Sequence, residues 1–395
     1  MTPRLRVSWR VPPPEIVRVS QKPALNGDPS LVAAHRALTE LRCGRALVIR
    51  RDAGDSGLLL AALETADTDL VERLRSAATG PLQLAVTTER AHALGLDVAM
   101  GQALHWTLPS ALSAEDIAKL SQDWRSEPWR IALSHASHSL TTDERVLAAL
   151  RLIKHAQLLP AALLAAASDS IASDDALHID LVALQRFQHL QDADIQRISE
   201  ARVPLRDCED SRLVLFRDRR DGTEHVAIQV GHPDPTQAIP LRLHSSCMTG
   251  DLLSSLRCDC GEQLGTAVQR LAGAGGGLLL YLAQEGRGIG LANKLRAYQL
   301  QDEGLDTIDA DLQLGFSSDE RGYSVAAAML RNLQVPTVRL LTNSPHKVRS
   351  LREAGIDVAE IGTLPGTPNP HNARYIRTKQ ERAGHFSTPI DDEED

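Results

Sequence analysis

The sequence predicts a two-domain α/β fold with α+β character, in which each domain contains a mixed sheet flanked by helices. The chain has 395 residues, which is long enough for two domains. From Pro29 onward, segments with helical periodicity alternate with short apolar segments typical of strands. A polar stretch at residues 201–210 contains a proline and indicates a domain junction near residue 200. We therefore expect an extension at residues 1–29, domains at residues 30–196 and 197–386, and an acidic tail at residues 387–395.

In the first domain, helical and strand patterns follow one another along the chain. Leu31–Leu41 is amphipathic and predicts a helix, while Arg45–Arg50 and Leu82–Thr87 predict strands. Helical patterns dominate from Glu144 to about Arg197. Within them, the apolar stretch Leu158–Ala167 predicts a buried helix.

The second domain opens with a predicted hairpin. Arg212–Arg217 and His225–Val230 alternate as strands do, and the turn pair Asp221-Gly222 lies between them. Two later apolar segments, Leu278–Leu282 and Val338–Leu341, predict strands that each lead into a helix.

Composition excludes several classes of protein. The formal net charge is −8 and the sequence pI is about 6.0, which argues against a general nucleic-acid binder because phosphate contacts need a basic surface. No apolar stretch is long enough to span a bilayer, and the first residues lack the apolar core of a signal peptide. Clustered cysteines in such a chain imply reduced thiols, so we expect a cytoplasmic location and no membrane partner.

Three of the five cysteines fall close together, at Cys247, Cys258 and Cys260. Three thiolates suit a soft divalent metal, most simply Zn²⁺. Three protein ligands leave one position open for water, as in catalytic zinc sites. The alternative is a structural site that a fourth ligand completes, perhaps His244 or a residue distant in sequence.

Around these cysteines, several segments together resemble GTP cyclohydrolase II, the first enzyme of riboflavin synthesis. They occur in the order and at the spacings of that family, over about residues 197 to 386. The segments are Arg242–Asp251, Ser255–Gly261, Gln284–Tyr298, Gln301–Thr307, Leu314–Arg321 and Leu340–Lys347.

The resemblance implies a reaction on GTP. Carbon 8 of the imidazole ring leaves as formate and pyrophosphate is lost from the 5′ side, which gives 2,5-diamino-6-ribosylamino-4(3H)-pyrimidinone 5′-phosphate. One zinc ion per chain would activate the water that attacks carbon 8. The resemblance also implies Mg²⁺ on the substrate triphosphate and a homodimer.

Three residues match catalytic positions of the family. Arg321 matches an arginine proposed to attack the α-phosphate, and Asp319 matches its proposed base. Because arginine stays protonated, Arg321 could instead clamp the phosphate while water attacks. Tyr298 matches a tyrosine associated with completing ring opening. The alternatives are a surface ion pair for Asp319 and Arg321 and a half-buried core residue for Tyr298.

Ten further residues match positions that contact the nucleotide. Lys347 lies in the first turn of the helix predicted to begin at Ser344 and Pro345, where an anionic ligand would explain its charge. Arg287 follows Leu278–Leu282 in a glycine-rich turn, where a phosphate contact is expected. The ten residues are Arg242, His244, Ser245, Gln263, Glu285, Gly286, Arg287, Thr307, Thr342 and Lys347.

Three positions depart from the family pattern. Ser246 replaces a usual glutamate, Gly322 replaces a common aspartate, and Ser344 replaces an asparagine. Ser246 leaves one rival function open, which is a related cyclohydrolase with another nucleotide or an incomplete reaction. The degenerate N-terminal half, described below, leaves a second rival open, which is a regulatory protein that binds zinc and nucleotide without turnover.

The first domain resembles 3,4-dihydroxy-2-butanone 4-phosphate synthase through Ala37–Ile49 and Thr87–Leu96. The acidic, metal-binding run of that family is missing, because Arg51–Gly57 is shorter and has no glutamate. The family's histidine motif falls near Asp143–Val146, which has no histidine. We therefore expect a degenerate domain that supports stability or dimer contacts, with a changed activity or an effector site as the alternative.

Overall fold

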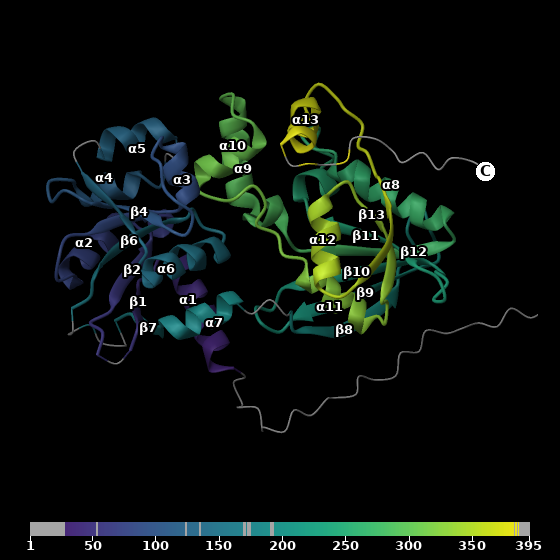
Figure 1. Cartoon of the computed structure of the whole chain (residues 1–395), viewed down its shortest axis with the longest axis horizontal. Coiled ribbons are helices and arrows are strands. Elements are labelled where there is room, and N and C mark those ends of the chain that lie inside the picture. The colour runs from purple at the N-terminus through teal and green to yellow at the C-terminus, as the bar shows by residue number, and fades with distance from the viewer. Residues whose placement is uncertain are drawn as a thin grey trace, which may run out of the picture.

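The computed structural model describes residues 28–382, 384 and 386, except 53, 123–124, 134–135, 169–170, 172–174 and 190–192. The predicted acidic tail, and the predicted extension up to residue 27, lie outside these residues. Figure 1 shows two bodies, each built on a seven-stranded mixed sheet with helices around it. The predicted fold class is confirmed. Within the described residues, no helix is both long and apolar enough to cross a membrane.

The first sheet has the strand order β5-β4-β3-β6-β2-β1-β7, in which only the β1–β7 pair is parallel. Its strands are β1 (Leu47–Arg50), β2 (Leu58–Ala62), β3 (Gln83–Val86), β4 (Ala103–Thr107), β5 (Ser137–Thr141), β6 (Ala161–Ala166) and β7 (Leu177–Asp180). The helices are α1 (Pro29–Arg42), α2 (Thr68–Ala77), α3 (Thr88–Ala93), α4 (Ala114–Lys119), α5 (Ser126–Leu133), α6 (Glu144–His155) and α7 (Leu181–His189), with a short 3₁₀ turn at Leu63–Thr65.

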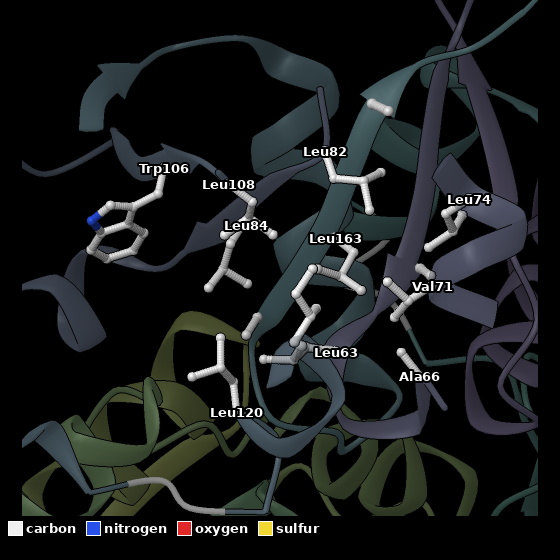
Figure 2. Packing of buried hydrophobic residues seen from close by; sticks show 14 of the residues in the cluster. Leu63, Ala66, Val71, Leu74, Leu82, Leu84, Trp106, Leu108, Leu120 and Leu163 are labelled. Atoms are coloured by element: carbon white, nitrogen blue, oxygen red, sulfur yellow. The ribbon is translucent and has the colours of Figure 1, made fainter. Parts of the chain in front are cut away.

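Both faces of the first sheet are covered by aliphatic side chains. Figure 2 shows one face, where Val71 and Leu74 of α2 share a buried cluster with Leu63 of the 3₁₀ turn, Leu84 of β3 and Leu163 of β6. Helices α1, α6 and α7 cover the opposite face. Each face thus removes a continuous apolar surface from water, which is the main favourable term in folding.

Three predictions for this domain are confirmed, since α1 covers the predicted helix at Leu31–Leu41, and β1 and β3 lie within the strands predicted at Arg45–Arg50 and Leu82–Thr87. The buried helix predicted at Leu158–Ala167 is wrong, because the stretch forms strand β6. Strand β6 lies between β3 and β2 and is buried on both faces, so its sequence shows no alternation. Without alternation, a short apolar run cannot be told from a buried helix.

The second sheet has the order β14-β13-β11-β12-β10-β9-β8. Its strands are β8 (Ile195–Arg202), β9 (Ser211–Asp218), β10 (Glu224–Gly231), β11 (Ile239–Ser245), β12 (Gly276–Leu282), β13 (Thr337–Leu341) and β14 (Asp357–Gly362). The helices are α8 (Cys260–Gly273), α9 (Gly290–Asp302), α10 (Thr307–Leu314), α11 (Ser324–Asn332), α12 (Pro345–Glu353) and α13 (Ala373–Glu381), with a π-helical turn at Met248–Leu252 and a 3₁₀ turn at Glu285–Gly288.

The predicted hairpin is present as antiparallel β9 and β10, and the strands predicted at Leu278–Leu282 and Val338–Leu341 form β12 and β13. The junction expected near residue 200 falls inside the second sheet instead. Strand β8 already begins at Ile195 and ends at Arg202, and residues 203–210 connect it to β9. Strand β8 lies at the edge of the sheet and its last residues are exposed. Because those residues are polar, the sequence of the strand resembles that of a linker.

Helices α9 and α10 lie between the two sheets, with α10 against α3 of the first domain (Figure 1). Thr87 donates a hydrogen bond from Oγ1 to the carbonyl of Gly315 at 2.8 Å. Leu159 of the first domain is buried in a cluster with Leu300 and Leu314. The two domains therefore share a packed, hydrogen-bonded interface.

Strands β11, β12 and β13 are parallel and adjacent to one another in the order β13-β11-β12. The cysteine run, the glycine-rich turn and the Thr342–Lys347 segment each follow the carboxyl end of one of these strands. Ligand sites of α/β sheets form at such ends. The fold thus brings motifs that are almost 100 residues apart to one edge.

Candidate active site

The three cysteines converge where β11 ends and α8 begins. Cys247 precedes the π-helical turn, and Cys260 is the first residue of α8. The three sulfurs lie within 4.8 Å of one another, and the Cys247 and Cys258 sulfurs are 3.7 Å apart. Two thiolates on a tetrahedral zinc ion with Zn–S bonds of about 2.3 Å would be about 3.8 Å apart. The donor set and its spacing fit zinc.

Gly250 keeps the space between the sulfurs free. A Cβ on this residue would lie 2.9 Å from the Cys258 sulfur and 3.1 Å from the Cys247 sulfur. The Gly250 N–H also donates to the Cys247 sulfur at 3.4 Å. The backbone therefore approaches the thiolates at a distance that only glycine permits, leaving a cradle for an ion.

A buried hydrogen-bonded group centred on Asp251 orients Cys247. Asp251 accepts from the Cys247 N–H at 2.9 Å and from the Tyr281 hydroxyl at 2.9 Å. His244, the alternative fourth metal ligand, interacts through Nε2 with Asp251 at 3.1 Å and stacks on Tyr281. Among the described residues, the group that could hold a metal consists of the three cysteines alone. His244, the alternative fourth ligand, is not part of that group.

The cysteines open into a pocket, which we call the cysteine pocket. Lys294 reaches into it from α9 and donates to Glu285 at 2.7 Å and to the Cys247 sulfur at 3.0 Å. Contacts with Cys258 and Cys260, followed by Lys294, lower the pKa of Cys247. The pocket is lined by Ser245, Ser246, Cys247, Cys258, Cys260, Gln284, Glu285, Gly286, Arg287, Ile289, Lys294, Ala297, Tyr298, Gln301, Thr307, Asp311, Arg321 and Tyr375.

The glycine-rich turn forms one wall of this pocket. Gly286 and Arg287 both have φ near +60°, a conformation that is strained for a non-glycine residue. Arg287 is held there because its guanidinium lies 3.5 Å from Asp311 and donates to the Ser318 carbonyl at 3.2 Å. Asp311 is only 4% exposed, and burial raises its pKa to about 7 although Arg287 opposes the shift.

A second pocket adjoins the first and is strongly cationic. The two share Ser245, Cys260, Arg287, Arg321 and Tyr375. Among the described residues, seven Lys and Arg side chains line this cationic pocket, against the single carboxylate of Asp319. The seven are Arg242, Arg287, Arg321, Lys347, Arg349, Lys379 and Arg382.

Two of these cations are buried, and no carboxylate in the described part of the chain contacts them directly. Lys347 is 6% exposed and donates to the Leu243 carbonyl at 2.6 Å. Burial, helped by Arg242 and Arg321, holds the pKa of Lys347 well below its usual value. Burial also lowers the pKa of Arg242 to about 10, and its Nε has no hydrogen-bond partner. Burying unpaired charge is costly, and an anionic ligand in this pocket would offset that cost.

Asp319 and Arg321 form a close pair at the border of the two pockets. Arg321 donates from Nε and Nη2 to the two carboxylate oxygens at 2.8 and 2.6 Å. Although burial alone would raise it, this guanidinium lowers the pKa of Asp319 to about 2. Arg321 Nη1 also approaches Ser245 Oγ at 3.4 Å. The side chains of the pair are 24% and 14% exposed, so they face a pocket and not the open surface.

All sixteen residues singled out from the sequence line one pocket or the other. Tyr298 lies in the cysteine pocket, where the Arg257 guanidinium is 4.9 Å from its ring and burial raises its pKa to about 12. Ser344 and Pro345 begin α12 as predicted, although the Ser344 side chain makes no capping hydrogen bond.

Sequence reasoning missed several residues that the fold brings to the site. Lys294 lies within the segment Gln284–Tyr298, but its position in that segment does not indicate that its side chain contacts a sulfur. Asp311, Tyr375 and Lys379 lie outside the motifs, and only the folding of α10 and α13 over the pockets brings them close. Of these residues, only Asp311 gave a signal that could have identified it, because it is a charged residue at a buried position of a helix.

Comparison with known proteins gives consistent matches. Residues 196–362 match the family model described as GTP cyclohydrolase II. A protein named GTP cyclohydrolase-2 from Azospirillum brasilense is 41% identical over 385 residues, covering 95% of this chain and 97% of its own length. A riboflavin biosynthesis protein, RibBA of Parabacteroides distasonis, is 48% identical over 174 residues, which are 44% of this chain and 43% of that protein.

Among solved structures, RibBX of A. baumannii, a two-domain 3,4-dihydroxy-2-butanone 4-phosphate synthase, aligns with 85% of this chain and 99% of its own. The TM-score is 0.29 and the sequence identity 14%. A likeness of this size carries no conclusion about the chemistry of either domain.

Proposed function

Because this chain is an enzyme of the GTP cyclohydrolase II family, we propose that it opens the imidazole ring of GTP and releases formate and pyrophosphate. The product would be 2,5-diamino-6-ribosylamino-4(3H)-pyrimidinone 5′-phosphate, which would place the reaction in riboflavin biosynthesis, as the name of the Parabacteroides relative suggests.

One observation carries the proposal, namely that a three-thiolate cradle and a pocket lined by seven cations share a wall. A zinc ion bound by Cys247, Cys258 and Cys260 would supply a Lewis acid and a water of lowered pKa. The cationic pocket would hold the triphosphate. A nucleotide that spans both pockets would present its base to the cysteines and its phosphates to Arg242 and Lys347.

Asp319 and Arg321 would act at the phosphate end of the nucleotide. The Asp319 carboxylate accepts from Nε and Nη2 of Arg321 and so fixes the guanidinium. The remaining nitrogen of Arg321, Nη1, then faces Ser245 and the wall that the two pockets share. A phosphate there would accept charge-assisted hydrogen bonds from a preorganised donor. This geometry serves a clamp as well as it serves a nucleophile.

In the cysteine pocket, Glu285 would act by positioning its neighbours. Its carboxylate accepts from the Met248 N–H at 2.6 Å and from Lys294 at 2.7 Å, so it joins the glycine-rich turn to the cysteine loop. Tyr298, with a raised pKa, would stay protonated and could donate to an oxygen or nitrogen of the opened ring.

Product analysis tests the proposal. GTP incubated with the zinc-loaded protein should yield formate, pyrophosphate and the pyrimidinone phosphate by mass spectrometry. Cys258→Ser should lose both bound zinc and formate release. A variant that keeps full zinc and full activity would contradict the ligand assignment. A parent that binds zinc and GTP without turnover would favour the regulatory alternative, and other products would favour a related cyclohydrolase.

The first domain, in our proposal, has no synthase activity. The Arg145 guanidinium lies between Asp55 and Asp143, at 2.9 and 2.8 Å, and Arg51 also contacts Asp143 at 2.9 Å. These carboxylates are already neutralised by arginine, so they offer little to a divalent cation. Incubation with ribulose 5-phosphate and Mg²⁺ should give no dihydroxybutanone phosphate, and measurable product would refute the idea. The homodimer and substrate-bound Mg²⁺ remain predictions.

A further inference from the structure

Helix α13 lies beyond the residues that match the family model, yet it forms part of the site. Tyr375 lines both pockets, and Lys379 lines the cationic pocket. The Lys379 ammonium is 4.0 Å from the centroid of the Tyr375 ring, so the two side chains form one wall. Figure 1 shows α13 on the same side of the second domain as α8 and α10.

The segment that leads into α13 is packed directly on the cysteine loop. A Cβ at Gly366 would lie 2.4 Å from the Cβ of Asp259, so the backbone passes over that side chain as closely as glycine allows. Thr367 donates its N–H to Glu262 at 2.9 Å. At its other end, α13 is tied to the start of α10 by ion pairs of Arg382. Contacts on both sides therefore fix the helix over the site.

Lys379 ends a chain of polar contacts that connects the two pockets. Its ammonium lies 3.2 Å from Asp259, which is 5% exposed and stands between two of the cysteines. The other Asp259 oxygen accepts from the Gln263 amide at 2.5 Å. Gln263 in turn accepts from Arg242 at 2.6 Å. A buried network of this kind is sensitive to the loss of one member.

We propose that Lys379 is a positioning residue that couples the metal loop to the phosphate pocket. Through Asp259 it fixes the cysteine loop, and through Gln263 it fixes Arg242 against the ligand. This inference rests on the proposed function, because it assumes that the cysteines bind metal and that the cationic pocket binds phosphate. It adds a residue of α13 to the site and predicts that one substitution there weakens both ligands.

The test compares Lys379→Met with Arg377→Met in the full-length protein. Arg377 is on the same helix but exposed, so this control removes the same charge without touching the network. Affinity for inorganic tripolyphosphate is measured by calorimetry, and zinc affinity by competition with a chromophoric chelator. Lys379→Met should weaken each by on the order of tenfold or more, as changes around metal ligands do. Arg377→Met should stay within about twofold of the parent, as expected for an exposed charge, and Lys379→Arg should recover part of the loss.

Hydrogen exchange of the parent provides a readout that needs no variant. Tripolyphosphate should slow amide exchange in α13. Equal affinities in Lys379→Met and Arg377→Met, or α13 exchange that tripolyphosphate leaves unchanged, would overturn the inference. If the parent turns over GTP but either of these two outcomes is observed, the role of Lys379 is refuted and the proposed function stands. If the parent binds neither zinc nor tripolyphosphate, the proposed function fails with it.

Discussion

Replacing Gly250 with alanine gives a quantitative test of the metal cradle. The added Cβ would lie 2.9 Å from the Cys258 sulfur, 2.9 Å from the Cys260 Cβ and 3.1 Å from the Cys247 sulfur, where ordinary contact begins at 3.4 Å. The neighbours must therefore move by about 0.3 to 0.5 Å to reach ordinary contact. Metal–ligand distances in proteins tolerate only about 0.2 Å. The φ angle of Gly250 is not positive, so the effect is steric and not conformational.

We expect Gly250→Ala to weaken zinc binding by about tenfold to a hundredfold, in the range seen when the support of metal ligands is disturbed. The assay is competition with a chromophoric zinc chelator under reducing conditions. Gly265→Ala is the matched control, because Gly265 lies on α8 and a Cβ there meets nothing within 4 Å. That control should bind zinc normally and gain slight helix stability. Parent-like zinc affinity in Gly250→Ala would refute the idea that the sulfurs are held in a preformed cradle.

Two further predictions concern the pockets. Arg321→Ala should still bind GTP but release pyrophosphate on the order of a hundredfold to a thousandfold more slowly, because it loses a preorganised electrostatic contact. Formate measured in the same reaction tells whether ring opening depends on that step, and pyrophosphate release at the parent rate would refute a catalytic role. Asp311→Asn tests the pH dependence of stability. Burial raises the pKa of Asp311 from 3.8 to about 7, so between these pH values the folded chain holds a proton that the unfolded chain has released. Folding stability should therefore fall as pH rises from about 4 to about 7, by up to about 4 kcal/mol at about 1.4 kcal/mol per pKa unit. The variant lacks this loss, so its Tm should exceed that of the parent at pH 8 and differ less at pH 5, and parallel Tm profiles would contradict the assignment.

Much of the site could be predicted from the sequence because its residues stand in compact motifs beside strand ends. The cysteine run, the glycine-rich turn and the Thr342–Lys347 segment each follow one of three parallel strands. Local spacing is therefore enough to place their side chains at one edge of the sheet. The same logic identified six of the fourteen described strands, among them β9 and β10, whose hairpin shows its alternation directly.

The failures have a common physical cause, which is that tertiary contact overrides local pattern. Strand β6 is buried on both faces, so its sequence lacks the alternation of apolar and polar residues that identifies a strand. Lys294 and Lys379 lie on helices whose exposed and buried faces depend on neighbours far away in the chain. Their partners, the Cys247 sulfur and Asp259, are 47 and 120 residues distant. No spacing rule reaches across such separations.

The interface between the domains indicates a role for the first one. Lys154 bridges Glu89 of its own domain to Glu320, at 3.2 and 2.9 Å, and Glu320 stands between Asp319 and Arg321 in sequence. Asn293 donates to the Gln157 carbonyl at 2.8 Å, which fixes the helix that carries Lys294 and Tyr298.

Through these contacts the first domain supports two walls of the site, even though its Asp55 and Asp143 are paired with arginine. It holds α9 and the Asp319–Arg321 loop where the two pockets meet, and that role needs packing and hydrogen bonds but no bound cation.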